Sequence, residues 1–277
     1  MKAALALLLC LAPALQAAEG QGSAWDESWP RFRVSEYVVT GLAVAGSAAN
    51  YFWVSPPRSA VWRGEILFDK GARNTLMGRS ESDRGRAKDL SNLLAYPLIG
   101  YSMLDGPIAA AWAVGDKDAA IQLSLINAET FAVTEALNLT VSKLMPRRRP
   151  DGAVCDPGSK YDPECVRSFW SGHAANVFAA ASLVCAEHGA MDLYGGNADA
   201  VACGTSLAVA SAVGVLRIAS NDHYASDVVV GAAVGAATGY LMPNLLHFKP
   251  RRSGGRLGAL IPNVGPYGGG LTYVKAW

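Results

Sequence analysis

The sequence predicts an all-α protein, a helical bundle of about six core helices with a short irregular or strand-like C-terminal tail. Helix-length apolar stretches recur along the 277-residue chain, and segments containing Gly, Pro or charged residues separate them. The last stretches are rich in Ala, Gly, Val and Ser, whose small side chains let helices pack closely. The composition, 51% hydrophobic and 17% charged, is more apolar than that of an average soluble domain.

The N-terminus has the pattern of a secretory signal peptide. Lys2 gives a positive start, an apolar run covers residues 3–11, and small residues end the segment at Ala17 and Ala18. The mature protein is therefore expected to be exported. We predict three parts: a signal peptide (1–18), a helical-bundle domain (19–250) and a Gly-rich tail (251–277).

The first half of the mature chain contains three expected helical stretches. Residues 37–57 carry no charge and form a long apolar helix that a Ser-Pro-Pro sequence ends. Residues 64–89 are charged and form an amphipathic or loop segment, and a second apolar stretch covers 90–114. Residues 117–144 form a helix whose Asn and Glu residues indicate a bundle interior or a partly wet surface, not a lipid-facing span.

The second half contains a loop and three more expected helices. The loop covers 146–167, and the helices cover about 173–187, 200–220 and 226–246. In the tail, Leu271, Tyr273 and Val274 indicate a short strand. Only residues 37–57 and 228–248 approach the ~20 apolar residues that a membrane span requires.

Four of the five cysteines follow the signal peptide, and an even count in an exported chain fits disulfides. Three pairings are possible. We favour Cys155 with Cys165, which closes a short loop, and Cys185 with Cys203, which joins the end of one helix to the start of the next. The alternative for the second pair is two free buried cysteines that pack as small hydrophobes. No C-x-x-C pair appears, so no zinc site is expected.

Three polar stretches late in the chain carry the groups needed to bind an anion and transfer a proton. They are K-L-M-P-R-R-R-P at 143–150, S-F-W-S-G-H at 168–173 and R-I-A-S-N-D-H-Y-A-S-D at 217–227. A phosphoryl group requires fixed cations and backbone amides around its oxygens, a nucleophile, and an acid for the leaving oxygen. The net charge of +1 gives no global field that would indicate nucleic acid as a partner.

The third stretch combines a nucleophile with its orienting group. Asp227 lies four residues after His223, so on a helix beginning near Tyr224 its carboxylate can accept the imidazole N–H. An oriented neutral imidazole is a competent nucleophile toward phosphorus. The plainer interpretation is a surface His beside an Asp.

In the second stretch, Ser171, Gly172 and His173 directly precede an apolar helix. A helix N-terminus presents free N–H groups and partial positive charge to a phosphate, and glycine lets the backbone come close. His173 is then placed to protonate the departing oxygen. The alternative is an N-cap Ser with an incidental His.

The first stretch places Lys143, Arg147, Arg148 and Arg149 directly before Pro150. Arginine makes forked contacts with phosphate oxygens, and lysine acts as a point charge. At least one of these arginines is expected to be a solvated or headgroup-binding residue instead.

Together, K-x5-R-P, S-F-W-S-G-H and R-x5-H-x3-D resemble the three-part signature of the type 2 phosphatidic acid phosphatase superfamily, over about residues 90–245. This superfamily includes bacterial acid phosphatases, lipid phosphate phosphatases and vanadium haloperoxidases. The resemblance implies a helical bundle and phosphate-ester hydrolysis through a phosphohistidine, without a metal or other cofactor. It makes His223 the nucleophile, Asp227 its orienting partner and His173 the general acid. It assigns the phosphate contacts to Lys143, Arg149, Ser171, Gly172 and Arg217.

The first motif departs from the family spacing, which has six residues between Lys and Arg-Pro. Lys143 and Arg149 have five between them, and Ser142 occupies the expected Lys position. One residue on a helix is a rotation of ~100°. Either Lys143 still reaches the phosphate by its long stem, or Arg147 substitutes for it. Trp170 also replaces the usual Pro and is expected to form a wall against a hydrophobic leaving group.

The resemblance leaves three classes of function. The first is an exported phosphatase in the periplasm, or in a cell-envelope membrane with its active site facing the periplasm. Its partner would be a phosphate ester or a lipid phosphate or pyrophosphate, with membrane association possible and no nucleic acid. The second class is a vanadium-dependent haloperoxidase, and the third is a non-catalytic envelope protein on the same scaffold.

Overall fold

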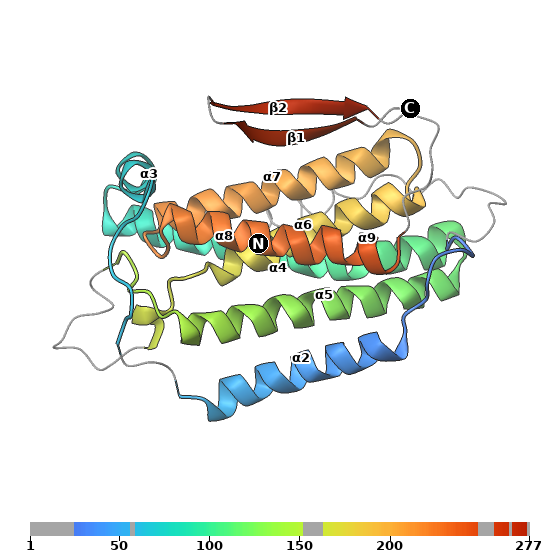
Figure 1. The fold of residues 1–277 in the computed structure, drawn as a ribbon, viewed down its shortest axis with the longest axis horizontal. Coiled ribbons are helices and arrows are strands. Elements are labelled where there is room, and N and C mark those ends of the chain that lie inside the picture. Colours follow the sequence, from blue (N-terminus) through green and yellow to red (C-terminus); the bar gives the residue numbers. More distant parts are fainter. Residues whose placement is uncertain (1–24, 56–58, 152–162, 249–257, 266–267, 276–277) are drawn as a thin grey trace.

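The computed structural model describes residues 25–55, 59–151, 163–248, 258–265 and 268–275. Long helices run side by side in a bundle, which confirms the all-α class (Figure 1). The α-helices are α2 (Val34–Trp53), α3 (Asp69–Leu76), α4 (Glu81–Ile108), α5 (Lys117–Leu144), α6 (Gly172–Met191), α7 (Asn197–Ala219), α8 (Ala225–Ala236) and α9 (Met242–Leu246). The π-helical turns are η1 (Ala109–Val114) and η4 (Ala237–Leu241), and η3 (Pro163–Val166) is a 3₁₀ turn. The expected signal peptide lies outside the described residues.

The C-terminal tail forms a β-hairpin. Strand β1 (Gly258–Gly265) pairs antiparallel with β2 (Gly268–Lys275), and Leu260 is opposite Tyr273. The strand expected near residues 271–274 is thus confirmed as part of β2.

Helix α6 is the centre of the bundle and contacts α4, α5, α7 and α8. Its sequence is apolar on all sides and rich in Ala, which is typical of a helix buried by neighbours all round. Small residues on the facing helix allow this packing. A Cβ added at Gly231 would lie 2.6 Å from the Ser171 carbonyl oxygen, and one at Gly235 would lie 2.1 Å from that of Ala175. The start of α8 is therefore fixed against the start of α6.

Helix α4 begins earlier than the sequence indicated. The segment 64–89 contains α3 and the first turns of α4, whereas the apolar pattern placed the helix start at about residue 90. A capping box causes the early start: the Ser80 hydroxyl accepts from the Asp83 amide at 3.1 Å, and the Asp83 carboxylate accepts from the Ser80 amide at 3.2 Å. The extra turns carry charged residues to the wall of the cavity described below.

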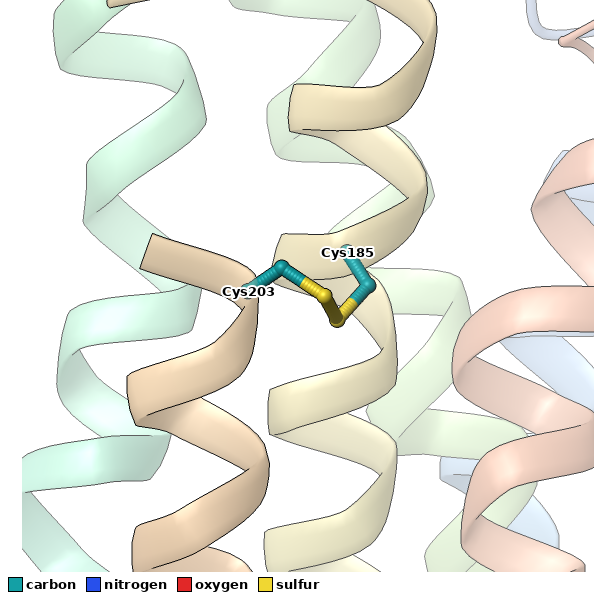
Figure 2. The surroundings of a disulfide bond; sticks show 2 residues. All are labelled: Cys185 and Cys203. Atoms are coloured by element: carbon teal, nitrogen blue, oxygen red, sulfur yellow. A yellow bond between two sulfur atoms is a disulfide. The ribbon is translucent and has the colours of Figure 1, made fainter. Parts of the chain in front are cut away.

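The structure confirms one of the two expected disulfides. Cys185 of α6 and Cys203 of α7 form a bond of 2.05 Å with their Cα atoms 4.5 Å apart (Figure 2). It joins the two helices at the end remote from the three motifs. Cys155 lies outside the described residues, so its pairing with Cys165 stays a prediction.

Two segments are long and apolar enough to cross a membrane by length and composition alone. They are α7 and the segment Ala225–Leu246, and the bundle buries 39% and 33% of their most apolar windows. The second matches the expected segment 228–248. Helix α2 is not among the segments that meet this test in the described part of the chain, so the expectation for 37–57 was wrong and α7 takes its place. Many apolar side chains of α2 are nevertheless exposed.

We predict that Gly235→Ala destabilises the bundle, although Ala favours a helix by about 1 kcal/mol over Gly. The added methyl would clash with the backbone of α6, and such overpacking costs about 1–3 kcal/mol. Gly204→Ala in α7 is the matched control, because a Cβ there meets nothing within 4 Å. Denaturant unfolding should show a lower free energy of unfolding for Gly235→Ala and an equal or higher one for Gly204→Ala. Equal stability of the two variants would contradict this account of the helix contact.

Candidate active site

The three motifs meet at a cavity of about 770 Å³ between α4, α5, the start of α6 and the end of α7. Its wall carries five cationic and five acidic side chains, so the cavity as a whole is not strongly basic. The cations are Arg84, Lys88, Arg149, Arg167 and Arg217, and the acids are Glu81, Glu135, Asp151, Glu164 and Asp222.

His223 lies on the loop between α7 and α8 and lines this cavity while being 4% exposed. Asn221 turns the chain toward it with a φ of 63°, a left-handed conformation that Asn tolerates, and Arg73 Nε donates to Asn221 Oδ1 at 2.8 Å. The His223 Nδ1 lies 2.8 Å from the Ser168 carbonyl oxygen. Because a carbonyl only accepts, Nδ1 carries the proton and Nε2 keeps the lone pair.

The surroundings of His223 keep the imidazole neutral. Burial lowers its pKa well below the usual value, and the positive charges of Arg149 and Arg217 lower it further. A neutral ring with a free Nε2 lone pair is the form that can attack phosphorus.

Asp227 does not contact His223 in the way that the sequence indicated. Its Oδ2 lies 4.0 Å from the His223 Nδ1, too far for a hydrogen bond. That oxygen accepts from Ser168 Oγ at 2.6 Å and from the Tyr224 amide at 3.0 Å. Asp227 thus holds Ser168, and the carbonyl of Ser168 orients the imidazole.

Arg147 is fully buried and occupies the centre of an ion-pair network. Its guanidinium donates to Asp69 at 2.8 Å and to Asp227 at 2.5 Å. It lies between two aromatic rings, 4.2 Å from the Trp62 centroid and 3.9 Å from that of Tyr224. This arginine is therefore not available to a phosphate, and the expectation that it could replace Lys143 is corrected.

Lys143 also lies away from the cavity wall in the described part of the chain. Its ammonium donates to the backbone carbonyls of Asn50 and Val54 at the end of α2. Ser142 lines the cavity instead, as the rotation of one residue along a helix requires. The first motif therefore places Arg149 at the cavity. Lys143 and Arg147, the two candidates for a second phosphate-binding cation in this motif, do not lie at the cavity wall.

The start of α6 has the expected N-terminal geometry. Ser171 is its N-cap, with the hydroxyl 3.3 Å from the Ala174 amide, and it is fully buried and not part of the described cavity wall. Gly172 lines the cavity, and a Cβ there would lie 2.6 Å from Asn138 Nδ2 of α5. Any other residue at this position would require the Asn138 side chain to move. Ser171 accepts from the Ala174 and Ala175 amides, whereas helix geometry leaves the Gly172 and His173 amides without intrahelical partners.

His173 lines the same cavity, and its Nε2 lies 3.0 Å from Asn92 Oδ1 of α4. Burial and the positive charge of Arg217 lower its pKa to about 4, so the ring is neutral at pH 7.

Asp222 gathers the cations next to His223. Arg149 and Arg217 each contact it at 3.2 Å, and Lys88 Nζ lies 3.6 Å from its Oδ1. Burial disfavours its charge, but Arg217, a hydrogen bond from Ser220, and Arg149 together lower the pKa of Asp222. It is a fixed anion that holds two predicted phosphate-binding arginines in place.

The structure thus brings together five of the eight predicted site residues, namely His223, His173, Gly172, Arg149 and Arg217. Trp170 also lines the cavity, as a wall residue should. Sequence reasoning missed four contributors: Ser168, Asp222, Lys88 and Asn92. Ser168 and Asp222 lie within the motifs, so sequence reasoning could have considered them as site residues. No sequence signal marks Lys88 and Asn92 of α4.

No group of three or more His, Cys, Asp or Glu side chains suited to a metal ion occurs among the described residues.

Comparison with known proteins agrees with the placement of the motifs. A model of the PAP2 superfamily matches residues 119–251, which include all three. A lipid A 1-phosphatase of Porphyromonas gingivalis is 38% identical over 95 residues, which cover 34% of this chain. The match spans 17% of the length of that protein. No solved structure gives a significant match.

We predict that Arg147→Met lowers the free energy of unfolding by about 3–5 kcal/mol, because it leaves the buried carboxylates of Asp69 and Asp227 unpaired. Arg148→Met is the control; it changes a neighbouring arginine that is only half-buried and should alter stability by no more than about 0.5 kcal/mol. Urea unfolding of the two variants measures both values. A stable Arg147→Met protein with a large loss of phosphate affinity would mean that Arg147 faces the substrate.

Proposed function

Because residues 119–251 form a domain of the PAP2 superfamily, we propose that this protein is a phosphatase that cleaves phosphate esters through a phosphohistidine on His223. The observation that carries the proposal is the neutral His223, oriented by the Ser168 carbonyl and lining one cavity with His173, Arg149 and Arg217. A nucleophile, an acid and fixed cations are the set that phosphoryl transfer needs.

In the first step, the Nε2 lone pair of His223 attacks phosphorus, and the bond between phosphorus and the ester oxygen breaks. The leaving oxygen takes a proton from His173. Arg149 and Arg217 stabilise the charge that develops on the phosphoryl oxygens, together with the amides at the start of α6. Ser171 contributes by capping that helix start rather than by touching the phosphate.

In the second step, neutral His173 takes a proton from a water molecule, and the water oxygen attacks phosphorus. The phosphorus–nitrogen bond breaks and His223 is neutral again. Inorganic phosphate leaves with the proton that His173 took from water, so His173 also returns to its neutral form. The proton that His173 needs can arrive with the substrate, because a phosphate monoester has its second pKa near about 6. A monoanion entering the cavity carries that proton.

We favour a lipid phosphate as the substrate. Leu90, Leu93 and Tyr96 are exposed on α4, and Tyr96 also lines the cavity. An apolar surface that begins at the cavity wall fits the acyl chains of a lipid whose phosphate is inside. The similarity to a lipid A 1-phosphatase supports the same class. The signal-like segment 1–18 and the disulfide Cys185–Cys203 support an exported enzyme.

We predict that His223→Ala retains less than about a tenth of the wild-type rate while the fold persists, since His223 lies on a loop at the cavity wall and not in a hydrophobic core cluster. The assay uses p-nitrophenyl phosphate and a short-chain phosphatidic acid in the presence of EDTA, with circular dichroism as the control for folding. A higher kcat/KM on the lipid favours the lipid class over soluble phosphomonoesters. Wild-type protein that hydrolyses neither substrate, or His223→Ala that keeps its rate, overturns the proposed function.

We predict that His173→Ala slows hydrolysis of an alkyl phosphate much more than that of p-nitrophenyl phosphate, whose leaving group scarcely needs a proton. For the alkyl substrate, kcat/KM should rise as the pH falls from about 8 to 5. The reason is that the protonated fraction of His173 grows toward its pKa of about 4, while burial and nearby positive charge lower the pKa of His223 and so favour its neutral, nucleophilic form. The variant should lose most of this rise. Equal losses on both substrates, or an unchanged pH profile, count against His173 as the acid.

A further inference from the structure

One face of α4 lines the candidate active site although α4 lies outside the three motifs and outside the PAP2 match. Lys88, Ser91 and Asn92 occupy positions i, i+3 and i+4 of this helix, which share one face. Ser91 Oγ accepts from Arg217 at 3.2 Å, and Asn92 Oδ1 lies 3.0 Å from His173 Nε2. The third residue of the face, Lys88, lines the cavity with a side chain that is 53% exposed.

We propose that Lys88 is the further cation that contacts the phosphate group of the substrate, beside Arg149 and Arg217. This inference rests on the proposed function. The two first-motif candidates for a further phosphate-binding cation both have other partners. Lys143 binds backbone carbonyls at the end of α2, and Arg147 is buried between Asp69 and Asp227. Lys88 reaches the same wall from a different helix.

The geometry favours a contact to substrate over a simple pairing of Lys88 with Asp222. The Nζ to Oδ1 distance of 3.6 Å is too long for a direct hydrogen bond. Asp222 already has Arg149 and Arg217 at 3.2 Å and Ser220 at 2.8 Å, so its charge is balanced without Lys88. The ammonium therefore keeps its donors for a group that enters the cavity.

The local charge also matches a phosphate. Lys88, Arg149, Arg167 and Arg217 share one ion-pair network with Asp222 and Glu164, and in this network the positive charges exceed the negative ones by two. A phosphate monoester carries about two negative charges at pH 7. Removing Lys88 would halve that surplus. A lysine on a flexible stem can follow the phosphoryl group as it moves toward His223.

The test combines binding of inorganic phosphate, measured by calorimetry, with steady-state kinetics on a short-chain phosphatidic acid. We expect Lys88→Met to weaken phosphate binding and to lower kcat/KM by about 10- to 100-fold, less than a buried oxyanion contact because Lys88 is half exposed. Lys88→Arg keeps the charge and should stay within about tenfold of wild type. Arg86→Met is the control: Arg86 is an exposed charge on α4 that does not line the described cavity, and its removal should change either value by less than about twofold.

A double-mutant cycle with Asp222→Asn separates the two roles. If Lys88 only pairs with Asp222, Lys88→Met has no further effect in the Asp222→Asn background, and the proposal is overturned. A loss that persists there supports it. Unchanged phosphate affinity and unchanged kcat/KM in Lys88→Met also overturn it. If the wild-type protein hydrolyses no phosphate ester but Lys88→Met still weakens phosphate binding, the proposed function fails while the anion contact of Lys88 stands.

Discussion

The buried guanidinium of Arg147 is the interaction on which the geometry of the site depends. It contacts Asp69 at the start of α3, Asp227 at the start of α8 and the Gly64 carbonyl. Asp227 in turn accepts from Ser168, whose carbonyl orients His223. Segments that are far apart in sequence are therefore joined through one charge that has no access to water. Two carboxylates at full burial are tolerable only because this cation lies between them.

Burial and the cations that would bind phosphate together favour the neutral form of both histidines. Burial lowers the pKa of His223 and of His173, and the positive charges of Arg149 and Arg217 lower both further. For His223 this preserves the lone pair on Nε2. For His173 it means that the ring is neutral at pH 7, with a pKa of about 4. Burial and nearby positive charge thus act on both imidazoles in the same direction, and under the proposed mechanism a bound phosphate would act on both in the opposite direction.

The sequence predicted what local pattern and composition determine. The helices, the pair Cys185–Cys203, and the meeting of His173, Gly172, Arg149, Arg217 and His223 followed from periodicity and motifs. Tertiary geometry decided the rest. Lys143 is shifted by one residue from the family position and faces α2. Arg147 is buried between two acids and does not line the cavity, although both residues belong to one basic run. No spacing rule distinguishes a structural arginine from a phosphate-binding one.

The position of α4 shows how such a site can change without change in its motifs. The motif residues at the cavity come from the loop before α6, the first turn of α6, the end of α7 and the loop before α8, and the contact of Gly231 with α6 and the Arg147 network hold these segments together. Helix α4 supplies the opposite wall from a separate segment, with Asn92 on His173 and Lys88 beside Asp222. Its residues can vary without disturbing the buried network, because Lys88 and Tyr96 are exposed. Under the proposed function, charge at Lys88 and apolar surface at Tyr96 would therefore influence which phosphate esters reach the histidines.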